Sequence, residues 1–156
     1  MAKLRGDKST LDLLNWTPEK LEIARFDDEQ VRAAAIGGKI SKAITTILMD
    51  AKLREDAPLN RTDVAKKMTD WLDHEVTENM LSAYCSEARI DHNISLPRAI
   101  ALMVVTEDSR LLSLIADEIG LAVIPKKYEG TVKEAILLEQ KEELEKEITL
   151  LRGKRK

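Results

Sequence analysis

The chain has 156 residues and a formal net charge of −3, with 44% hydrophobic residues but only 3% aromatic ones. One compact domain with an appendage fits this length, and its core must be built from aliphatic side chains. A single cysteine, Cys85, excludes an internal disulfide, and we see neither a signal-peptide pattern nor an apolar run of about 20 residues that would cross a bilayer. Abundant Ala, Leu, Glu and Lys favour helix almost throughout, so we expect an all-α cytoplasmic protein without a membrane segment.

Residues 1–26 are predicted to form an N-terminal arm, charged at first and then apolar around Trp16, which packs on its own domain or on another subunit. The next helix is expected to start from a cap at Asp27 or Asp28 and to run to about residue 52. Gly37 and Gly38 fall in its middle, where they would kink the helix or allow a close crossing. The apolar residues at helical spacing are Val31, Ala34, Ala35, Ile40, Ala43, Ile44, Ile47, Leu48 and Ala51.

Four shorter helices are predicted to complete a domain over residues 27–125. They span about residues 61–72, 78–89 and 96–106, and the last one starts at residues 106–108 and is ended by Gly120. The helix over 78–89 has Thr77 as N-cap, and the helix over 96–106 has Ser95 as N-cap and Pro97 in its first turn. Residues 121–125 are predicted to be a short extended piece. The helix over residues 61–72 is expected to bury Val64, Ala65, Met68 and Leu72. The helix over residues 78–89 is expected to bury Leu81, Tyr84, Cys85 and Ala88.

Residues 126–156 are predicted to be a charged helix with a basic tail. Leu137, Leu144 and Leu151 are seven residues apart, and Lys141 and Ile148 follow the first two of them by four, which is a heptad with Leu at d. Because only about three heptads fit, the helix is marginal alone. It either pairs with another copy or lies on its own domain, and the tail either frays or contacts phosphates.

The helices over residues 61–72 and 78–89 are typical of a helix-turn-helix. Ala65 lies deep in the first helix, a polar turn follows, and Leu81 and Tyr84 form the inner face of the second helix. On the opposite face, a polar stripe has side chains that can hydrogen-bond to base edges in the major groove. The stripe consists of Asn79, Ser82, Ser86 and Arg89. The predicted phosphate contacts are Arg61, Thr62, Lys66 and Lys67.

The charge distribution argues against this interpretation. Residues 53–125 hold seven Lys or Arg against thirteen Asp or Glu, whereas residues 1–52 hold nine against eight and residues 126–156 hold nine against seven. Neutralisation of phosphates supplies most of the non-specific affinity for DNA, so an acidic domain is at a disadvantage. Glu78 and Glu87 flank the polar stripe. The stripe is therefore either a DNA-reading face or an ordinary solvated surface.

The five predicted helices between residues 36 and 119 resemble the λ-repressor-like fold of phage regulators. Residues 94–106 and 108–120 are similar to the end of CII-type regulatory proteins, and residues 84–88 with 124–128 look like small proteins of Mu-like transposable prophages. The resemblance covers about half of the chain. It implies DNA-facing positions at Thr77, Asn79 and Ser82. The chain departs from the family at the turn, where Thr69 replaces the usual glycine and residues 70–75 are inserted.

Other classes of site find little support in the sequence. His74, Cys85 and His92 match no zinc spacing, and a buried cysteine is a poor nucleophile. We therefore expect no enzyme activity, no cofactor and no metal. The leading hypothesis is a sequence-specific regulator that binds double-stranded DNA in a Mu-like prophage, acting as a homo-oligomer through its arm or its C-terminal helix. The alternative is an adaptor with the same fold that binds a phage or host protein instead of DNA.

Overall fold

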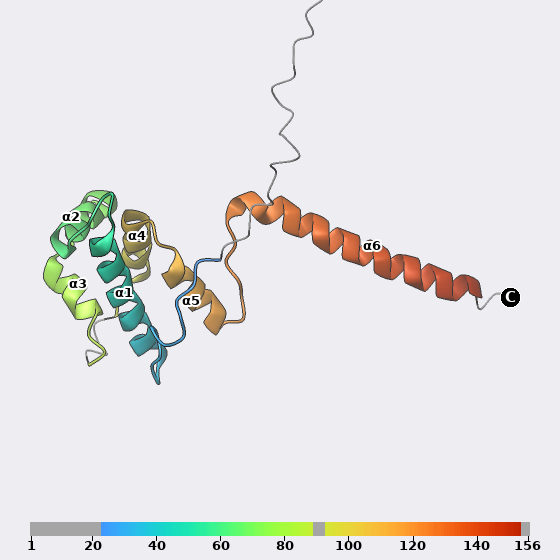
Figure 1. The fold of residues 1–156 in the computed structure, drawn as a ribbon, viewed down its shortest axis with the longest axis horizontal. Coiled ribbons are helices and arrows are strands. Elements are labelled where there is room, and N and C mark those ends of the chain that lie inside the picture. The colour runs from blue at the N-terminus through green and yellow to red at the C-terminus, as the bar shows by residue number, and fades with distance from the viewer. Residues whose placement is uncertain (1–22, 89–92, 154–156) are drawn as a thin grey trace, which may run out of the picture.

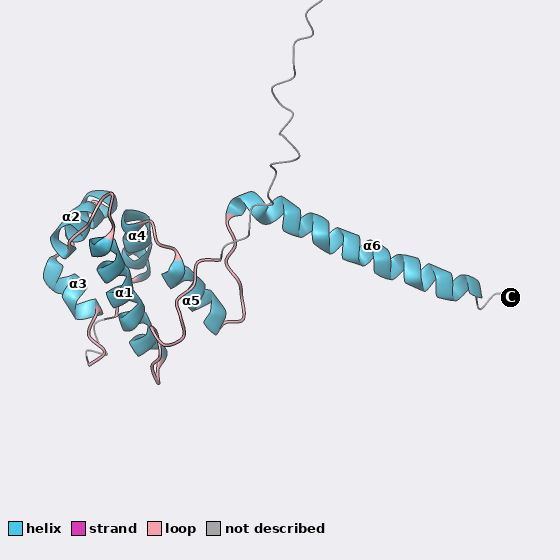
Figure 2. Ribbon diagram, viewed as in Figure 1, coloured by secondary structure: helices cyan, strands magenta, loops and turns pink. Residues whose placement is uncertain are grey.

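The computed structural model describes residues 23–88 and 93–153, and every regular element in these ranges is a helix, as Figure 2 shows. In Figure 1, α1 to α5 gather into a bundle and α6 extends away from it. The elements are α1 (Ile36–Leu53), α2 (Arg61–Leu72), α3 (Glu78–Tyr84), α4 (Leu96–Thr106), α5 (Arg110–Glu118), the 3-10 turn η1 (Lys126–Tyr128) and α6 (Glu129–Gly153). The predicted all-α class is confirmed for these residues.

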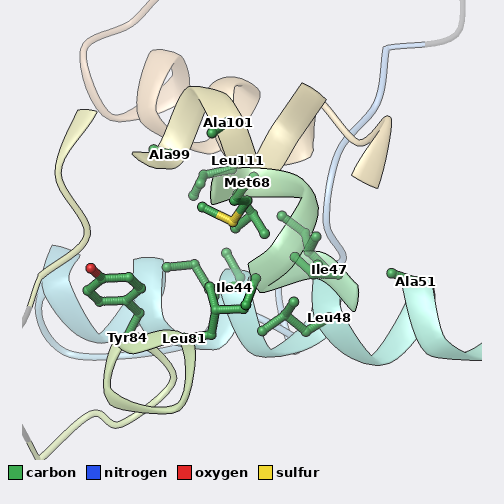
Figure 3. Close-up of a cluster of buried hydrophobic side chains, with 14 of the residues drawn as sticks. Ile44, Ile47, Leu48, Ala51, Met68, Leu81, Tyr84, Ala99, Ala101 and Leu111 are labelled. Carbon is green, nitrogen blue, oxygen red and sulfur yellow. The ribbon is translucent and has the colours of Figure 1, made fainter. Parts of the chain in front are cut away.

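The core of the bundle is aliphatic and is shared by all five helices (Figure 3). Ile44 of α1, Met68 of α2 and Leu81 of α3 are each fully buried. Burial of side chains of this size contributes about 1.5–3 kcal/mol each. Tyr84 is the only aromatic residue in the described ranges that is buried, and its hydroxyl accepts a hydrogen bond from Arg98 Nη1 at 2.9 Å. The core thus fixes α3 against α1 and α2.

The first helix begins later than the sequence predicted. Its N-cap is Ala35, and neither Asp27 nor Asp28 caps it. Asp27 instead closes a turn, in which its carbonyl oxygen accepts a hydrogen bond from the backbone N–H of Gln30 at 2.9 Å. Ala34 and Ala35, predicted to be in the core, are exposed because they lie in the connection before the helix.

The glycine pair lies in the first turn of α1, and not in its middle as predicted. A Cβ atom on Gly38 would be 3.0 Å from the Cβ of Ala33, where the chain folds back before entering the helix. Of the two predicted roles, a kink and a close backbone approach, the contact fits the second. The nearest atom belongs to the segment before the helix, and among the described residues the other atoms near the two glycines are side-chain oxygens of Glu87 and Asn93, neither of which lies in a helix.

The bounds of α2 and α4 match the prediction, and those of α5 are shorter. Glu107 has φ of 51°, which ends α4, and the Asp108 carboxylate accepts a hydrogen bond from the Arg110 backbone N–H at 3.0 Å, so that α5 starts at Arg110. Gly120 has φ of 73°, a left-handed conformation that favours glycine, and ends the helix as predicted. Residues 121–125, predicted to be a short extended piece, have no regular secondary structure.

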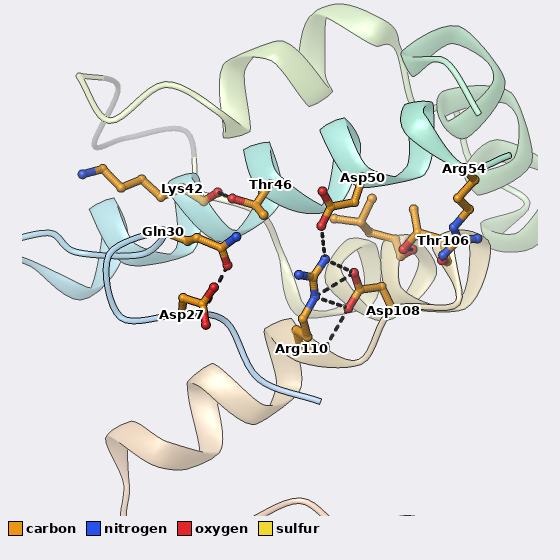
Figure 4. Close-up of polar contacts among 10 residues, drawn as sticks. Asp27, Gln30, Lys42, Thr46, Asp50, Arg54, Thr106, Asp108 and Arg110 are labelled. Carbon is orange, nitrogen blue, oxygen red and sulfur yellow. Dashed lines mark hydrogen bonds and ion pairs between the residues drawn. The ribbon is translucent and has the colours of Figure 1, made fainter. Parts of the chain in front are cut away.

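Arg110, at the start of α5, links this helix to α1 and to the segment that precedes α1 (Figure 4). Its guanidinium is hydrogen-bonded to Asp108 at 2.6 Å and to Asp50 at 2.5 Å, and it lies 4.6 Å from the centre of the Phe26 ring. The hydrogen bonds to Asp108 raise the pKa of Arg110 above its ordinary value, against the opposing effect of burial, and Asp50 adds to the increase. Residues 23–26 of the predicted arm therefore lie on their own domain, whereas residues 1–22 lie outside the described ranges.

The C-terminal helix is confirmed, and it does not lie on the bundle. None of the 25 residues of α6 is buried. Its large apolar side chains are exposed, namely Val132, Ile136, Leu137, Leu138, Leu144, Ile148, Leu150 and Leu151. An isolated helix of this length gains little stability from its own hydrogen bonds, so a helix with these side chains in water lacks the packing that normally stabilises it. The basic tail, residues 154–156, lies outside the described ranges.

Candidate nucleic-acid interface

The first helix of the predicted motif, α2, starts with a complete capping box. The Asn60 side chain accepts a hydrogen bond from the Asp63 backbone N–H at 2.9 Å, and the Asp63 carboxylate accepts one from the Asn60 backbone N–H at 3.4 Å. This arrangement satisfies orphan donors at the helix start and places a carboxylate there. The N-terminus of α2 is therefore less open to a phosphate than the sequence suggested.

The turn between α2 and α3 is held by Thr69, which stands where the resembled family has a glycine. Its hydroxyl accepts a hydrogen bond from the Val76 backbone N–H at 2.9 Å, and its hydroxyl oxygen lies 3.2 Å from the Val76 carbonyl oxygen. Asp73 leaves α2 in a left-handed conformation, with φ of 51°. The longer connection is thus a fixed turn that returns the chain to the side of α2.

The second helix of the motif, α3, has the predicted start but not the predicted end. The Thr77 hydroxyl accepts a hydrogen bond from the Met80 backbone N–H at 3.3 Å, as expected of an N-cap. The helix ends at Tyr84 after seven residues, and not near Arg89. Beyond this end, the Glu87 carboxylate lies 3.8 Å from Lys42 Nζ of α1. This tertiary contact lies in the segment that was predicted to be the last turn of the helix.

The shorter helix divides the predicted polar stripe. Asn79 and Ser82 lie on α3, Ser86 follows its end, and Arg89 lies outside the described residues. Ala88, predicted to be buried, is exposed beyond the helix, and Cys85 is only partly buried. Residues 85–88 contain neither glycine nor proline, so no strong stop signal marks this end of the helix.

Two residues that were predicted to contact phosphates, Arg61 and Thr62, also join α2 to α3. Arg61 Nη1 donates a hydrogen bond to Ser82 Oγ at 3.2 Å, and Thr62 Oγ1 donates one to Glu78 Oε2 at 2.8 Å. Glu78 is the sole charged residue of α3. These bonds link the two helices, and the hydroxyl of Thr62 occupies one oxygen of the Glu78 carboxylate.

Lys66 and Lys67 are both exposed, but they lie on different flanks of α2. Lys66 is four residues after Thr62 and three before Thr69, and both of those contact the segment that begins α3. Residues at these spacings share one face of a helix, so Lys66 lies on the α3 side. Lys67 is rotated from it by about 100° around the helix axis, away from α3. Only Lys66 thus lies beside the outer surface of α3.

A cleft of about 390 Å³ lies between the end of α1 and the starts of α2 and α3. Lys52 lines it together with Arg61 and Thr62, and Lys52 was not among the predicted phosphate contacts. The hydrogen bond from the Leu59 backbone N–H to the Ala51 carbonyl oxygen, at 2.9 Å, brings these segments together. No local pattern in the sequence indicates such a contact. The cleft thus adds two cationic side chains, Lys52 and Arg61, to the candidate interface.

No protein-family model, curated protein or solved structure matches this chain. Within residues 23–88 and 93–153, no three His, Cys, Asp or Glu side chains gather in a way that could hold a metal ion. No helix in these ranges has both the length and the apolar character needed to cross a bilayer. Of the histidine and cysteine residues considered from the sequence, His74 is exposed and His92 lies outside the described ranges.

Proposed function

We propose that the chain is a sequence-specific, double-stranded DNA-binding regulator of the kind found in Mu-like prophages. The observation that carries the proposal is the anchoring of α3. Leu81 and Tyr84 bury its inner face, Thr69 fixes the turn before it, and Asn79 on its outer surface is exposed. A rigid short helix with a free amide on its outer face is suited to reading a base edge, because Asn forms paired hydrogen bonds with adenine.

In the proposed complex, the phosphate contacts come from outside α3. Lys66 lies beside α3, and Lys52 and Arg61 line the neighbouring cleft. Glu78 lines the same cleft as Lys52 and Arg61, and its carboxylate accepts a hydrogen bond from Thr62. The assignment to a Mu-like prophage rests on the resemblance of residues 84–88 and 124–128 to small proteins of such prophages, and the regulatory role rests on that of residues 94–106 and 108–120 to CII-type regulators.

Fluorescence anisotropy with fragments that flank the gene, at several salt concentrations, tests the proposal. Asn79→Ala should weaken binding to the preferred fragment by about 1–3 kcal/mol and reduce its preference over the others. Lys66→Ala should weaken binding to all fragments and reduce the salt slope by about one. Lys67→Ala is the matched control, because the same residue type on the far flank of α2 should have a smaller effect.

Two outcomes contradict the proposal. In the first, the folded protein fails to bind any fragment at low salt. In the second, it binds, but Lys66→Ala and Lys67→Ala are equally impaired and Asn79→Ala is not, which places the DNA elsewhere on the surface. Circular dichroism of each variant shows whether the fold is retained, since all three positions are exposed.

An adaptor function is the second candidate, and an exposed face of α4 favours it. Leu96, Ile100 and Val104 are spaced four residues apart and are 67%, 40% and 49% exposed. Apolar side chains that line one helix face in this way are typical of a surface that binds another protein. This candidate requires that the folded protein not bind the fragments. DNA binding that depends on Asn79 would exclude it as the main function.

A further inference from the structure

The C-terminal helix carries an apolar seam that nothing within the described chain covers. Leu137, Leu144, Ile148 and Leu151 are 64%, 59%, 46% and 63% exposed. With Lys141 they follow alternating spacings of four and three residues, which places all five on one side of the helix. Heptad a positions are then Lys141 and Ile148, and the leucines occupy d.

The charges beside this seam are complementary to those of a second copy. Glu147 occupies the g position before Ile148, and Arg152 occupies the e position after Leu151. In a parallel pair in register, a g residue faces the e residue five positions further along the other helix. Glu147 would therefore face Arg152 of the second copy, and by symmetry the pair would form twice. This pair of opposite charges therefore favours a parallel, in-register arrangement.

The residues at the a positions favour two strands. A β-branched residue at a with leucine at d favours a parallel dimer, and Ile148 between Leu144 and Leu151 has this pattern. A single lysine at an a position fixes register and strand number at a cost in stability. Lys141 Nζ lies 3.7 Å from Glu145 Oε1 of the same helix, with both side chains well exposed, so the ammonium group already points to the edge of the seam.

We propose that α6 pairs with α6 of a second copy of this chain as a parallel, in-register, two-stranded coiled coil. The seam of Leu137, Leu144, Ile148 and Leu151 forms its core, and the Glu147 and Arg152 pairs set its orientation. The proposal is independent of DNA binding, because it uses no residue of α2 or α3. It also gives each dimer two copies of α3.

Sedimentation equilibrium of the full chain tests the pairing. Leu151→Lys places a charge in the seam and should raise the dissociation constant of the dimer by about tenfold or more. Leu150→Lys is the matched control, because Leu150 is the adjacent residue, is 66% exposed and lies off the seam. It should change the constant by about twofold at most. Since no residue of α6 is buried, the bundle should unfold at the same temperature in both variants.

Charge exchange tests the orientation. Glu147→Arg and Arg152→Glu each place like charges opposite one another in a parallel homodimer, whereas a mixture of the two variants restores attraction in the heterodimer. Native mass spectrometry of the mixture should therefore show more heterodimer than random pairing gives. A wild-type chain that is monomeric at about 100 µM overturns the proposal, as do equal effects of the Leu150 and Leu151 variants. Random pairing, or a seam-dependent trimer or tetramer, overturns the parallel two-stranded assignment.

Discussion

The turn between α2 and α3 depends on one hydroxyl group, and Thr69→Val is the substitution that isolates it. Valine keeps the shape and the β-branched backbone preference of threonine but removes the oxygen. The Val76 backbone N–H then loses the acceptor 2.9 Å away, in a segment where Val76 itself is 4% exposed. A buried donor without a partner costs about 1–3 kcal/mol, and partial exposure of Thr69 puts the expected loss at about 1–2 kcal/mol.

Thr69→Ser is the matched control, since serine keeps the hydroxyl and removes one methyl group worth at most about 0.8 kcal/mol. Urea unfolding followed by circular dichroism measures both variants. With a slope of about 2 kcal/mol per molar urea, in the middle of the typical range, the valine variant should unfold about 0.5–1 M earlier than wild type at an unchanged slope, and the serine variant should lie between them. Equal midpoints for the two variants would show that the hydroxyl does not hold the turn.

Three further substitutions test other contacts of the bundle by the same urea assay. Arg110→Met leaves the Asp108 carboxylate, whose side chain is 12% exposed, without its main partner, and should cost about 1–3 kcal/mol, whereas Arg110→Lys should lose less; equal losses would show that charge plays no part. Asn60→Ala removes the N-cap of α2 and should cost about 1 kcal/mol, and an unchanged midpoint would contradict the capping box. Gly120→Ala should cost about 1 kcal/mol because φ is 73° there, although a Cβ atom would meet open space.

Elements with strong local signals could be predicted from the sequence. Thr77 before α3, Pro97 in the first turn of α4 and Gly120 after α5 each act within one helical turn. Asn60, which caps α2, was not among the predicted caps. Both ends of α2 and α4 and the start of α3 agree with prediction. The heptad pattern did not predict whether α6 lies on the bundle or extends away from it. An apolar seam indicates that a helix needs a partner, but it does not show which surface that partner provides.

The errors arose where distant residues decide the local structure. α1 begins at Ile36 because the preceding segment folds across the bundle, with Val31 buried and Phe26 beneath Arg110. α3 ends at Tyr84, and Glu87 reaches back to Lys42 on α1. Neither contact has a signature within the affected segment. The same cause explains why neither the cleft beside Lys52 nor the hydrogen bond from Arg61 to Ser82 was predicted.

The coiled coil and the DNA-binding proposal make a joint prediction, because an acidic bundle with few cations near α3 gains affinity if two bundles bind together. Linking two binding modules raises overall affinity by about 10²–10⁴ without any new contact, provided that both can engage. If both proposals hold, Leu151→Lys should weaken DNA binding although it lies on α6 and contacts neither α2 nor α3.

In the anisotropy assay, the Leu151→Lys variant should bind the preferred fragment more weakly and with a shallower salt slope than wild type, since a monomer neutralises fewer phosphates in one binding event than a dimer does. Leu150→Lys adds the same charge to the same helix without entering the seam, so it controls for direct attraction between the new lysine and DNA. Weaker binding by Leu151→Lys alone therefore means that the dimer is the DNA-binding unit. Undiminished binding by a variant shown to be monomeric would mean that a single bundle suffices and that pairing through α6 serves another purpose.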